Sequence, residues 1–320
     1  MRIVLCYPVE KRHYDQICAA APGAEVVDAG QERIAKEILA ADIFCGHAKV
    51  PMPWDAVVEG GRLQWIQSSA AGLDHCLVPA VVESEIIVTS ASGVLADQVS
   101  EHAVALLTGL LRSLPVFFRA QQAKQFIRRP TRDLHHATIG IVGLGGVGRR
   151  LAEVLSAFRT RILATDTFPF QKPSHVESLW AADRLDEMLP LVDILILTAP
   201  LTERTRGMID RRALARMKPG SILINVARGP LVVEADLVDA IESGHLYGAA
   251  LDVTEVEPLS AASRLWELPN VILTPHVGGQ SSRRIDQMTD FFCENLHRYQ
   301  AQLPLNNLVD KRLGYPVRQP

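Results

Sequence analysis

Three segments in the second half of the sequence carry side chains suited to acid–base chemistry on a carboxylic acid. Arg228 lies in Asn-Val-Ala-Arg-Gly, Glu257 lies in Val-Glu-Pro-Leu, and His276 lies in Thr-Pro-His. A guanidinium binds a carboxylate in a bidentate manner, and a histidine held by a carboxylate donates and accepts protons. Reduction of a 2-keto acid needs these three groups. Taken singly, Arg228 could be a surface ion-pair residue and His276 a buried structural histidine.

A glycine pattern upstream indicates a dinucleotide site. The segment 138–149 contains Gly-x-Gly-x-x-Gly, between an apolar run and an amphipathic one. In such a turn Gly143 permits the tight bend, Gly145 lets a pyrophosphate approach the backbone, and Gly148 lets helix and strand pack closely. Asp166 ends the next apolar run, where an acid accepts hydrogen bonds from ribose hydroxyls. Its charge would repel a 2′-phosphate, so the sequence predicts NAD in preference to NADP.

These residues require elements that bring them to one edge of a sheet. Apolar runs alternate with helix-period segments, which predicts an α/β protein with two doubly wound parallel-sheet domains. We expect helices over 31–40, 97–111, 147–158 and 284–299. We expect strands at 3–7, 25–29, 42–46, 63–69, 86–90, 138–142, 161–166, 194–198, 221–226, 248–253 and 271–274.

The two series of strands define the expected domains. Residues 1–98 with 286–320 form a smaller, flavodoxin-like substrate domain, and residues 99–285 form a Rossmann NAD-binding domain. The helix over 97–111 leads into the second domain, and the helix over 284–299 returns to the first. A length of 320 residues fits two domains better than one.

Composition excludes several classes of protein. A net charge of −3 without a long basic cluster argues against a nucleic-acid partner. The apolar stretch 103–111 is too short to span a bilayer, so we expect no membrane association. The five cysteines are scattered and form no Cys-x-x-Cys pair, which argues against disulfides and metal sites and favours the cytoplasm.

From about residue 138 to 279, the order, spacing and strand-end placement of these motifs resemble the D-isomer-specific 2-hydroxyacid dehydrogenase family. That family includes glyoxylate/hydroxypyruvate reductases and phosphoglycerate dehydrogenases, and the likeness extends over nearly the whole chain. The resemblance implies NAD-dependent hydride transfer between nicotinamide and C2 of a small D-2-hydroxy acid or 2-keto acid. It makes His276 the general acid/base, Glu257 the group that orients it and favours its imidazolium form, and Arg228 the ligand of the substrate carboxylate.

The resemblance also implies further site residues. The backbone of Ala70, Ala71 and Gly72 would bind the substrate carboxylate together with Arg228 and His276, and Asp252 would hydrogen-bond the nicotinamide carboxamide. The residues it places at the cofactor are Gly143, Gly145, Gly146, Val147, Gly148, Asp166, Ala199, Pro200, Thr205, Val226, Ala227, Arg228, Asp252, His276, Gly278 and Gly279.

Several alternatives stay open. An NAD(H)-sensing, corepressor-like regulator on the same fold would keep the same trio, and a formate- or phosphite-type relative is a weaker reading. Glyoxylate or hydroxypyruvate is the favoured substrate, but no residue decides between small keto acids. We expect a homodimer through the NAD-binding domains and the linking helix. Glu101 and His102 on that helix are interpreted as structural support rather than chemistry.

Overall fold

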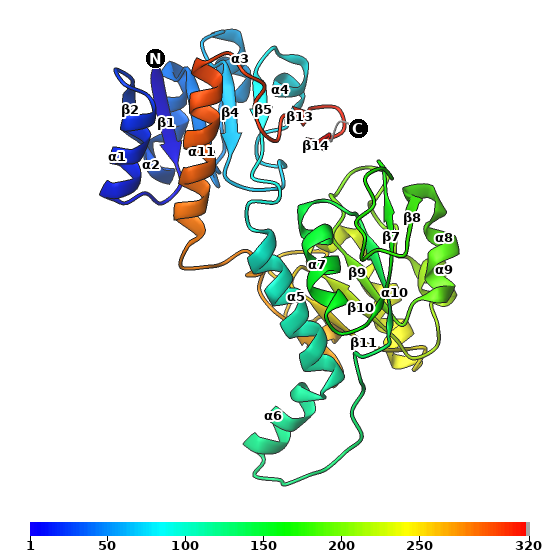
Figure 1. The fold of residues 1–320 in the computed structure, drawn as a ribbon. Helices are drawn as coiled ribbons and strands as arrows, with labels where there is room; N and C mark the ends of the chain where they lie inside the picture. The colour runs from blue at the N-terminus through cyan, green and yellow to red at the C-terminus, as the bar shows by residue number, and fades with distance from the viewer. Residues whose placement is uncertain (318–320) are drawn as a thin grey trace. The chain divides into compact units, whose positions relative to one another are not determined.

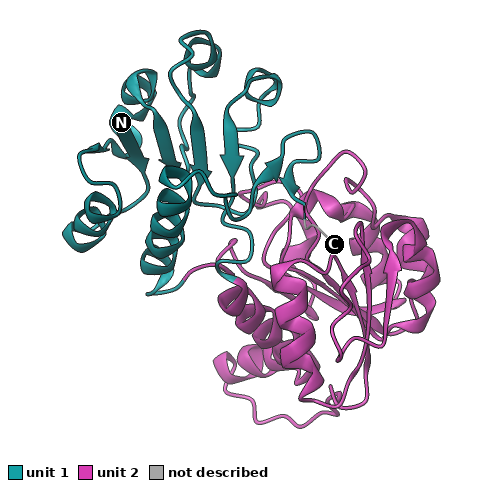
Figure 2. Cartoon of the chain, turned by 45° about the horizontal axis from the view of Figure 1, so that its top comes forward, with its two compact units in different colours: residues 1–95, 281–319 teal, residues 96–280, 320 magenta. Residues whose placement is uncertain are grey.

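The computed structural model describes residues 1–317 and shows the predicted α/β fold, with helices packed on parallel sheets (Figure 1). The chain divides into two compact units (Figure 2). Unit 1 contains Met1–Leu95 and the segment that begins at Ser281, and unit 2 contains Ala96–Gln280. The boundaries predicted from the sequence lie a few residues later in the chain. Residues 318–320, assigned to the first domain in that prediction, lie outside the described residues.

Unit 1 is built on a five-stranded parallel sheet with the order β2-β1-β3-β4-β5. Alternate side chains of β1 face opposite sides, as strand geometry requires. Ile3 and Leu5 pack with Phe292 and Leu296 of the C-terminal helix, whereas Val4 packs on the other face. The strands are β1 (Arg2–Cys6), β2 (Glu25–Asp28), β3 (Ile43–Gly46), β4 (Trp65–Ser68) and β5 (Ile87–Thr89).

The helices of unit 1 cover both faces of this sheet. Helix α11 returns to unit 1 and packs beside α1, as the sequence predicts for the segment 284–299. The helices are α1 (Lys11–Ala20), α2 (Gly30–Glu37), α3 (Trp54–Glu59), α4 (Pro79–Glu83) and α11 (Arg284–Gln300), with a 3-10 turn η1 (Ile38–Ala40). A short antiparallel pair, β13 (Val309–Asp310) and β14 (Tyr315–Pro316), follows α11.

Unit 2 contains a seven-stranded parallel sheet with the order β12-β11-β10-β9-β6-β7-β8. The chain runs outward from β6 to β8 and then returns to β9 on the other side of β6. The switch point therefore lies between β6 and β9, where open α/β sheets bind their ligands. The strands are β6 (Thr138–Val142), β7 (Arg161–Asp166), β8 (Ser178–Ala181), β9 (Ile194–Leu197), β10 (Ser221–Asn225), β11 (Leu246–Leu251) and β12 (Val271–Leu273).

Two apolar cores sandwich the sheet of unit 2. Ile194 and Ile196 pack toward α5 and α7, whereas Leu195 and Leu197 pack toward α9 and α10. The helices are α5 (Ala96–Leu111), α6 (Leu114–Gln122), α7 (Gly146–Ser156), α8 (Leu185–Met188), α9 (Arg211–Arg216) and α10 (Glu234–Glu242). Short 3-10 turns are η2 (Ala182–Arg184), η3 (Leu189–Leu191), η4 (Gly229–Leu231) and η5 (Arg264–Trp266).

No single helix of the described chain is long and apolar enough to cross a membrane. Helices α5 and α6 pass that test only when taken together, and they are bent by 68° at the break between them.

Candidate active site

The glycine turn joins β6 to α7 at the switch point of unit 2. Gly143 has φ +93°, and a Cβ there would lie 2.8 Å from the backbone of Ala199. A Cβ at Gly148 would lie 2.1 Å from the carbonyl oxygen of Gly143, so helix and strand pack as closely as the sequence pattern predicts. A Cβ at Gly145 would meet nothing within 4 Å. The opening of α7 is thus tightly packed on its protein side and open at Gly145.

Asp166 ends β7 beside this turn. Its Oδ2 accepts a hydrogen bond from the amide of Leu144 at 2.6 Å, and its Oδ1 accepts one from the amide of Phe168 at 2.8 Å. Each carboxylate oxygen can accept more than one hydrogen bond, so these contacts leave acceptor capacity for a ligand. Asp166 therefore holds the glycine turn in place as well as standing where a ribose is expected.

The segment after β9 closes the other side of the switch point. The hydroxyl of Thr198 donates to the carbonyl of Gly143 at 2.5 Å. Thr205 donates its hydroxyl proton to the carbonyl of Pro200 at 2.8 Å, which fixes the turn between them. Ala199, Pro200 and Thr205, which were all expected at the cofactor, therefore lie in one ordered loop.

Arg228 lies in the loop after β10, and the side chain of Asn225 shapes that loop. Asn225 accepts a hydrogen bond from the amide of Ala227 at 3.0 Å and donates one to the carbonyl of Arg228 at 3.0 Å. The next residue, Gly229, lies so close to the loop after β11 that a Cβ would be 1.7 Å from the carbonyl oxygen of Thr254. The arginine loop and the glutamate loop are therefore packed backbone against backbone.

Glu257 and His276 form a hydrogen-bonded pair. Nδ1 of His276 lies 2.9 Å from Oε2 of Glu257, and the amide of Thr254 donates to the other oxygen of Glu257 at 3.3 Å. The side chains are 48% and 40% exposed, so solvent or a ligand reaches both. Because Nδ1 faces the carboxylate, Nε2 is the atom through which His276 can exchange a proton with a substrate.

The turn that carries His276 is stabilised by hydrogen bonds to Asp252. This carboxylate is almost fully buried and accepts hydrogen bonds from the amide of Val277 at 2.9 Å and the amide of Gly278 at 2.8 Å. The hydroxyl of Thr274 donates to it at 2.7 Å. These three hydrogen bonds show that Asp252 stabilises the turn. Its contact with a nicotinamide carboxamide stays a prediction.

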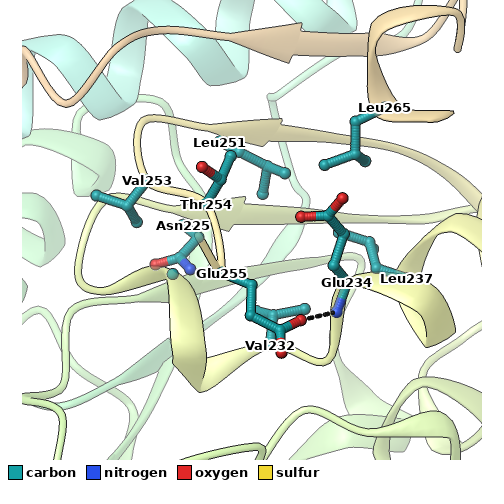
Figure 3. Close-up of a pocket in the computed structure, with 10 residues that line it drawn as sticks. Asn225, Val232, Glu234, Leu237, Leu251, Val253, Thr254, Glu255 and Leu265 are labelled. Carbon is teal, nitrogen blue, oxygen red and sulfur yellow. Dashed lines mark hydrogen bonds between the residues drawn. The ribbon is translucent and has the colours of Figure 1, made fainter. Parts of the chain in front are cut away.

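A small cavity lies behind the loops that carry Arg228 and Glu257. Its volume of about 10 Å³ suits one water molecule and not a substrate. Figure 3 shows Glu255 beside it, with its carboxylate accepting a hydrogen bond from the amide of Glu234 at 3.0 Å. Glu255 thus satisfies an amide at the start of α10 and anchors the glutamate loop to that helix.

In unit 1 the expected carboxylate loop follows β4. The amide of Ala70 donates to the hydroxyl of Ser68 at 3.1 Å, which leaves Ala71 and Gly72 as the better candidates for ligand contact. The ring of His75 stacks on that of His47 with centroids 4.0 Å apart. Burial, together with the neighbouring His47, lowers the pKa of His75 to about 3. The imidazole of His75 is therefore an uncharged, partly buried group next to the loop.

Unit 2 brings together most of the residues singled out in the sequence. The glycine turn, Asp166, Arg228, Glu257 and His276 all follow the carboxyl ends of strands in one sheet. Ala70, Ala71 and Gly72 belong to unit 1. The bridging role of Asn225 was missed, because a polar residue at a strand end gives no sign in the sequence of which backbone groups it will meet.

The comparisons with known proteins agree with this architecture. The family model described as "D-isomer specific 2-hydroxyacid dehydrogenase, NAD binding domain" matches residues 104–278. An (S)-sulfolactate dehydrogenase from Chromohalobacter salexigens is 37% identical over 225 residues, which are 68% of this chain and 72% of that protein. The D-3-phosphoglycerate dehydrogenase of Mycobacterium tuberculosis is 31% identical over 260 residues, 80% of this chain and 49% of that protein.

The chain thus spans about half the length of that phosphoglycerate dehydrogenase. Among solved structures, a D-isomer-specific 2-hydroxyacid dehydrogenase from Xanthobacter autotrophicus, in complex with NADPH and MES, superposes with a TM-score of 0.84 and 28% identity. That match covers 98% of this chain and 99% of the other. Family model, relatives and fold agree: the chain belongs to the D-isomer-specific 2-hydroxyacid dehydrogenase family, and unit 2 contains its NAD-binding domain.

Proposed function

We propose that this protein is an NAD-dependent D-2-hydroxyacid dehydrogenase that interconverts a small 2-keto acid and its D-2-hydroxy acid. The observation that carries the proposal is the pair of His276 and Glu257, 2.9 Å apart, at the same edge of the sheet as the glycine turn. A dinucleotide turn alone indicates only a cofactor. A carboxylate-held histidine beside it supplies the proton that accompanies a hydride.

The residues of unit 2 fit a dinucleotide. The open position at Gly145 leaves room for a pyrophosphate against the backbone, at the start of an 11-residue helix whose amides favour an anion. When bound, the nicotinamide would supply or accept the hydride at C2 of the substrate.

The side chains would then transfer the proton and bind the substrate carboxylate. In the reductive direction His276 donates the proton on Nε2 to the C2 oxygen, and Glu257 stabilises the imidazolium that precedes this transfer. Arg228 binds the carboxylate with its planar fork. The substrate role of Ala70, Ala71 and Gly72 in unit 1 stays a prediction from the family resemblance. One hydride and one proton convert the ketone into the alcohol.

Asp166 supports NAD as the preferred cofactor. A carboxylate at this position accepts hydrogen bonds from ribose hydroxyls and repels a 2′-phosphate. The residues that follow it, Thr167 and Phe168, carry no charge to attract that phosphate. The similar Xanthobacter structure contains NADPH, so this preference is the part of the proposal that needs its own test.

We also propose a cytoplasmic location, which the five free cysteines support. We further propose that the protein forms a homodimer through its NAD-binding units. The sequence interpretation placed the contact on the helix over 97–111. Most apolar side chains of α5 are buried within unit 2. Phe118 on α6 and Phe126 just after it are 58% and 95% exposed, which makes this segment the better candidate for the contact.

A substrate panel tests the proposed function. Glyoxylate, hydroxypyruvate, 3-phosphohydroxypyruvate and 3-sulfopyruvate would each be assayed with NADH and with NADPH, following absorbance at the nicotinamide band. We expect NADH oxidation with at least one of the small acids, and formation of the D-hydroxy acid wherever the product has a stereocentre at C2. Tight NADH binding without turnover of any acid would contradict the proposal and favour the NAD(H)-sensing alternative.

A further inference from the structure

His102 is a partly buried histidine of α5 that the proposed chemistry does not use. Its Nε2 lies 2.9 Å from the hydroxyl oxygen of Thr274 and 3.1 Å from Oδ1 of Asp252. Thr274 and Asp252 belong to the segments that follow β12 and β11. The imidazole therefore joins the linking helix to the two loops that meet beneath His276.

The hydrogen bonds fix the direction of donation in this cluster. The hydroxyl of Thr274 has one proton, and it donates that proton to Oδ1 of Asp252 at 2.7 Å. Thr274 can then only accept from His102, so Nε2 of His102 carries a hydrogen. Its second close partner, Asp252, is also an acceptor. A donor at this atom is thus what the cluster requires.

The cluster of His102, Thr274 and Asp252 stabilises an unusual backbone conformation at His276. His276 has φ +54°, in the left-handed region that non-glycine residues seldom adopt. Such a conformation persists where surrounding contacts hold it, and here its own amide donates to the carbonyl of Asp252 at 2.8 Å. The amides of Val277 and Gly278 donate to the Asp252 carboxylate. The orientation of Asp252 therefore determines where His276 lies.

Packing adds a steric restraint to the same cluster. A Cβ at Gly278 would lie 2.9 Å from Oδ2 of Asp252 and 3.4 Å from Cδ2 of His102. Backbone, carboxylate and imidazole are thus in close contact, and movement of His102 would leave Asp252 free to turn.

We propose that His102 is a positioning residue for proton transfer: through Thr274 and Asp252 it holds the turn that sets His276 against Glu257. This inference rests on the proposed function for its kinetic consequence, but not for its structural one. A purely structural role, in which His102 only anchors α5, would lower stability without changing the His276–Glu257 pair.

The test compares His102→Leu with His102→Gln, whose amide can donate from a similar place. His245→Leu is the matched control, because His245 precedes β11 at the opposite end of that strand and its Nε2 bonds the carbonyl of Leu214 at 3.0 Å. We expect His102→Leu to lower kcat about tenfold or more, with KM for NADH changed less than about threefold. His102→Gln should recover most of kcat, and His245→Leu should keep it.

Thr274→Val keeps the shape of the side chain and removes the hydroxyl, so it tests the same connection if His102→Leu does not fold. We expect Thr274→Val to lower kcat in the same way as His102→Leu. In the double variant His102→Leu/Thr274→Val, the fold loss of kcat should be smaller than the product of the two single losses. Unchanged kcat in both His102→Leu and Thr274→Val, or equal losses in His102→Gln and His102→Leu, would overturn the inference.

A spectroscopic reading separates this inference from the proposed function. The ring nitrogen resonances of His276, assigned with a His276→Gln sample, should move in His102→Leu and Thr274→Val and stay in place in His245→Leu. If the wild-type protein turned over no keto acid, the proposed function would fail, and these resonances would still decide the role of His102. Unmoved His276 resonances in both variants would refute it.

Discussion

The carboxylate of Asp166 accepts hydrogen bonds from the amides of Leu144 and Phe168, so it shapes the glycine turn as well as facing a ribose. Removal of its charge and removal of its acceptor oxygens are therefore different experiments. An asparagine keeps one acceptor oxygen and loses the charge that opposes a 2′-phosphate.

We predict that Asp166→Asn raises the ratio of kcat/KM for NADPH to that for NADH by about tenfold, because one charge repulsion of about 1.4 kcal/mol is lifted. Steady-state kinetics with both cofactors provide the measurement. Asp183→Asn, an exposed carboxylate in η2, is the control and should leave the ratio unchanged. An unaltered ratio in Asp166→Asn would show that Asp166 does not select the cofactor.

His75 provides a prediction about acid stability. Its pKa in the folded protein is lowered to about 3, first by burial and then by His47, from the ordinary histidine value of about 6.5. In the unfolded chain His75 therefore binds a proton near pH 6.5, whereas in the folded protein it stays unprotonated until a much lower pH. The free energy of unfolding falls as the pH drops below about 6.5.

Between about pH 7 and pH 5 we expect this residue to cost the folded state about 2 kcal/mol. In urea denaturation at several pH values, His75→Gln should therefore lose less stability over this interval than the wild type. Asp74 adjoins His75 in the sequence, so Asp74→Asn is a suitable control for a general effect of the loop. Parallel pH curves for His75→Gln and the wild type would contradict the lowered pKa.

At this scale the sequence predicted which residues to examine and not the contacts between them. Arg228, Glu257 and His276 could be singled out because their types and strand-end positions match a known chemistry. The contact of His102 with Thr274 joins residues 172 positions apart, and helix periodicity does not say what faces a half-buried position. Such a partner becomes visible only when the chain is folded.

Among the elements, the buried strands were the most predictable. Strands β6 and β7 begin and end at the predicted residues, because both faces of each are covered and the apolar run is continuous. Strand β8 at the sheet edge was not predicted, since all four of its residues are only partly buried and its apolar run is short. The short helix α6 was also missed.

The packing between the loops after β10 and β11 gives an element-scale prediction. A Cβ at Gly229 would overlap the carbonyl of Thr254, so Gly229→Ala must push the arginine loop away from the glutamate loop. We expect a loss of about 2–3 kcal/mol in the free energy of unfolding, measured by urea denaturation, together with lower kcat.

Gly145→Ala is the matched control for this substitution. Its Cβ would meet nothing within 4 Å, so the free energy of unfolding should change by less than about 1 kcal/mol. The same methyl group should weaken NADH binding, which fluorescence titration would measure. Equal stability losses in the two variants would show that the contact between Gly229 and Thr254 is not tight.

For the molecule as a whole, the alternation of apolar and helical segments was enough to predict two α/β units, each with a parallel sheet. It could not predict which apolar side chains would remain exposed. Leu107 and Leu111 of α5 are buried in the core of unit 2, whereas Phe118 and Phe126 are exposed. Sequence periodicity treats these positions alike, and only packing separates them.

Assembly can be tested at these aromatic residues. We predict that the wild-type protein sediments as a dimer at micromolar concentration and that Phe118→Ser combined with Phe126→Ser sediments as a monomer. The reason is that both side chains leave water only if another chain covers them. Leu39→Ser, at an exposed apolar residue of unit 1, is the control and should remain dimeric. A wild-type monomer would refute the proposed homodimer.

In the proposed reaction, His276 transfers the proton that accompanies the hydride at C2. The most direct measurement is the turnover of NADH with the best keto acid of the panel by the wild type and by His276→Gln, with the Kd for NADH determined on the same samples. We predict that His276→Gln lowers kcat by about 100-fold or more and leaves that Kd within about twofold. Wild-type turnover by His276→Gln would contradict it.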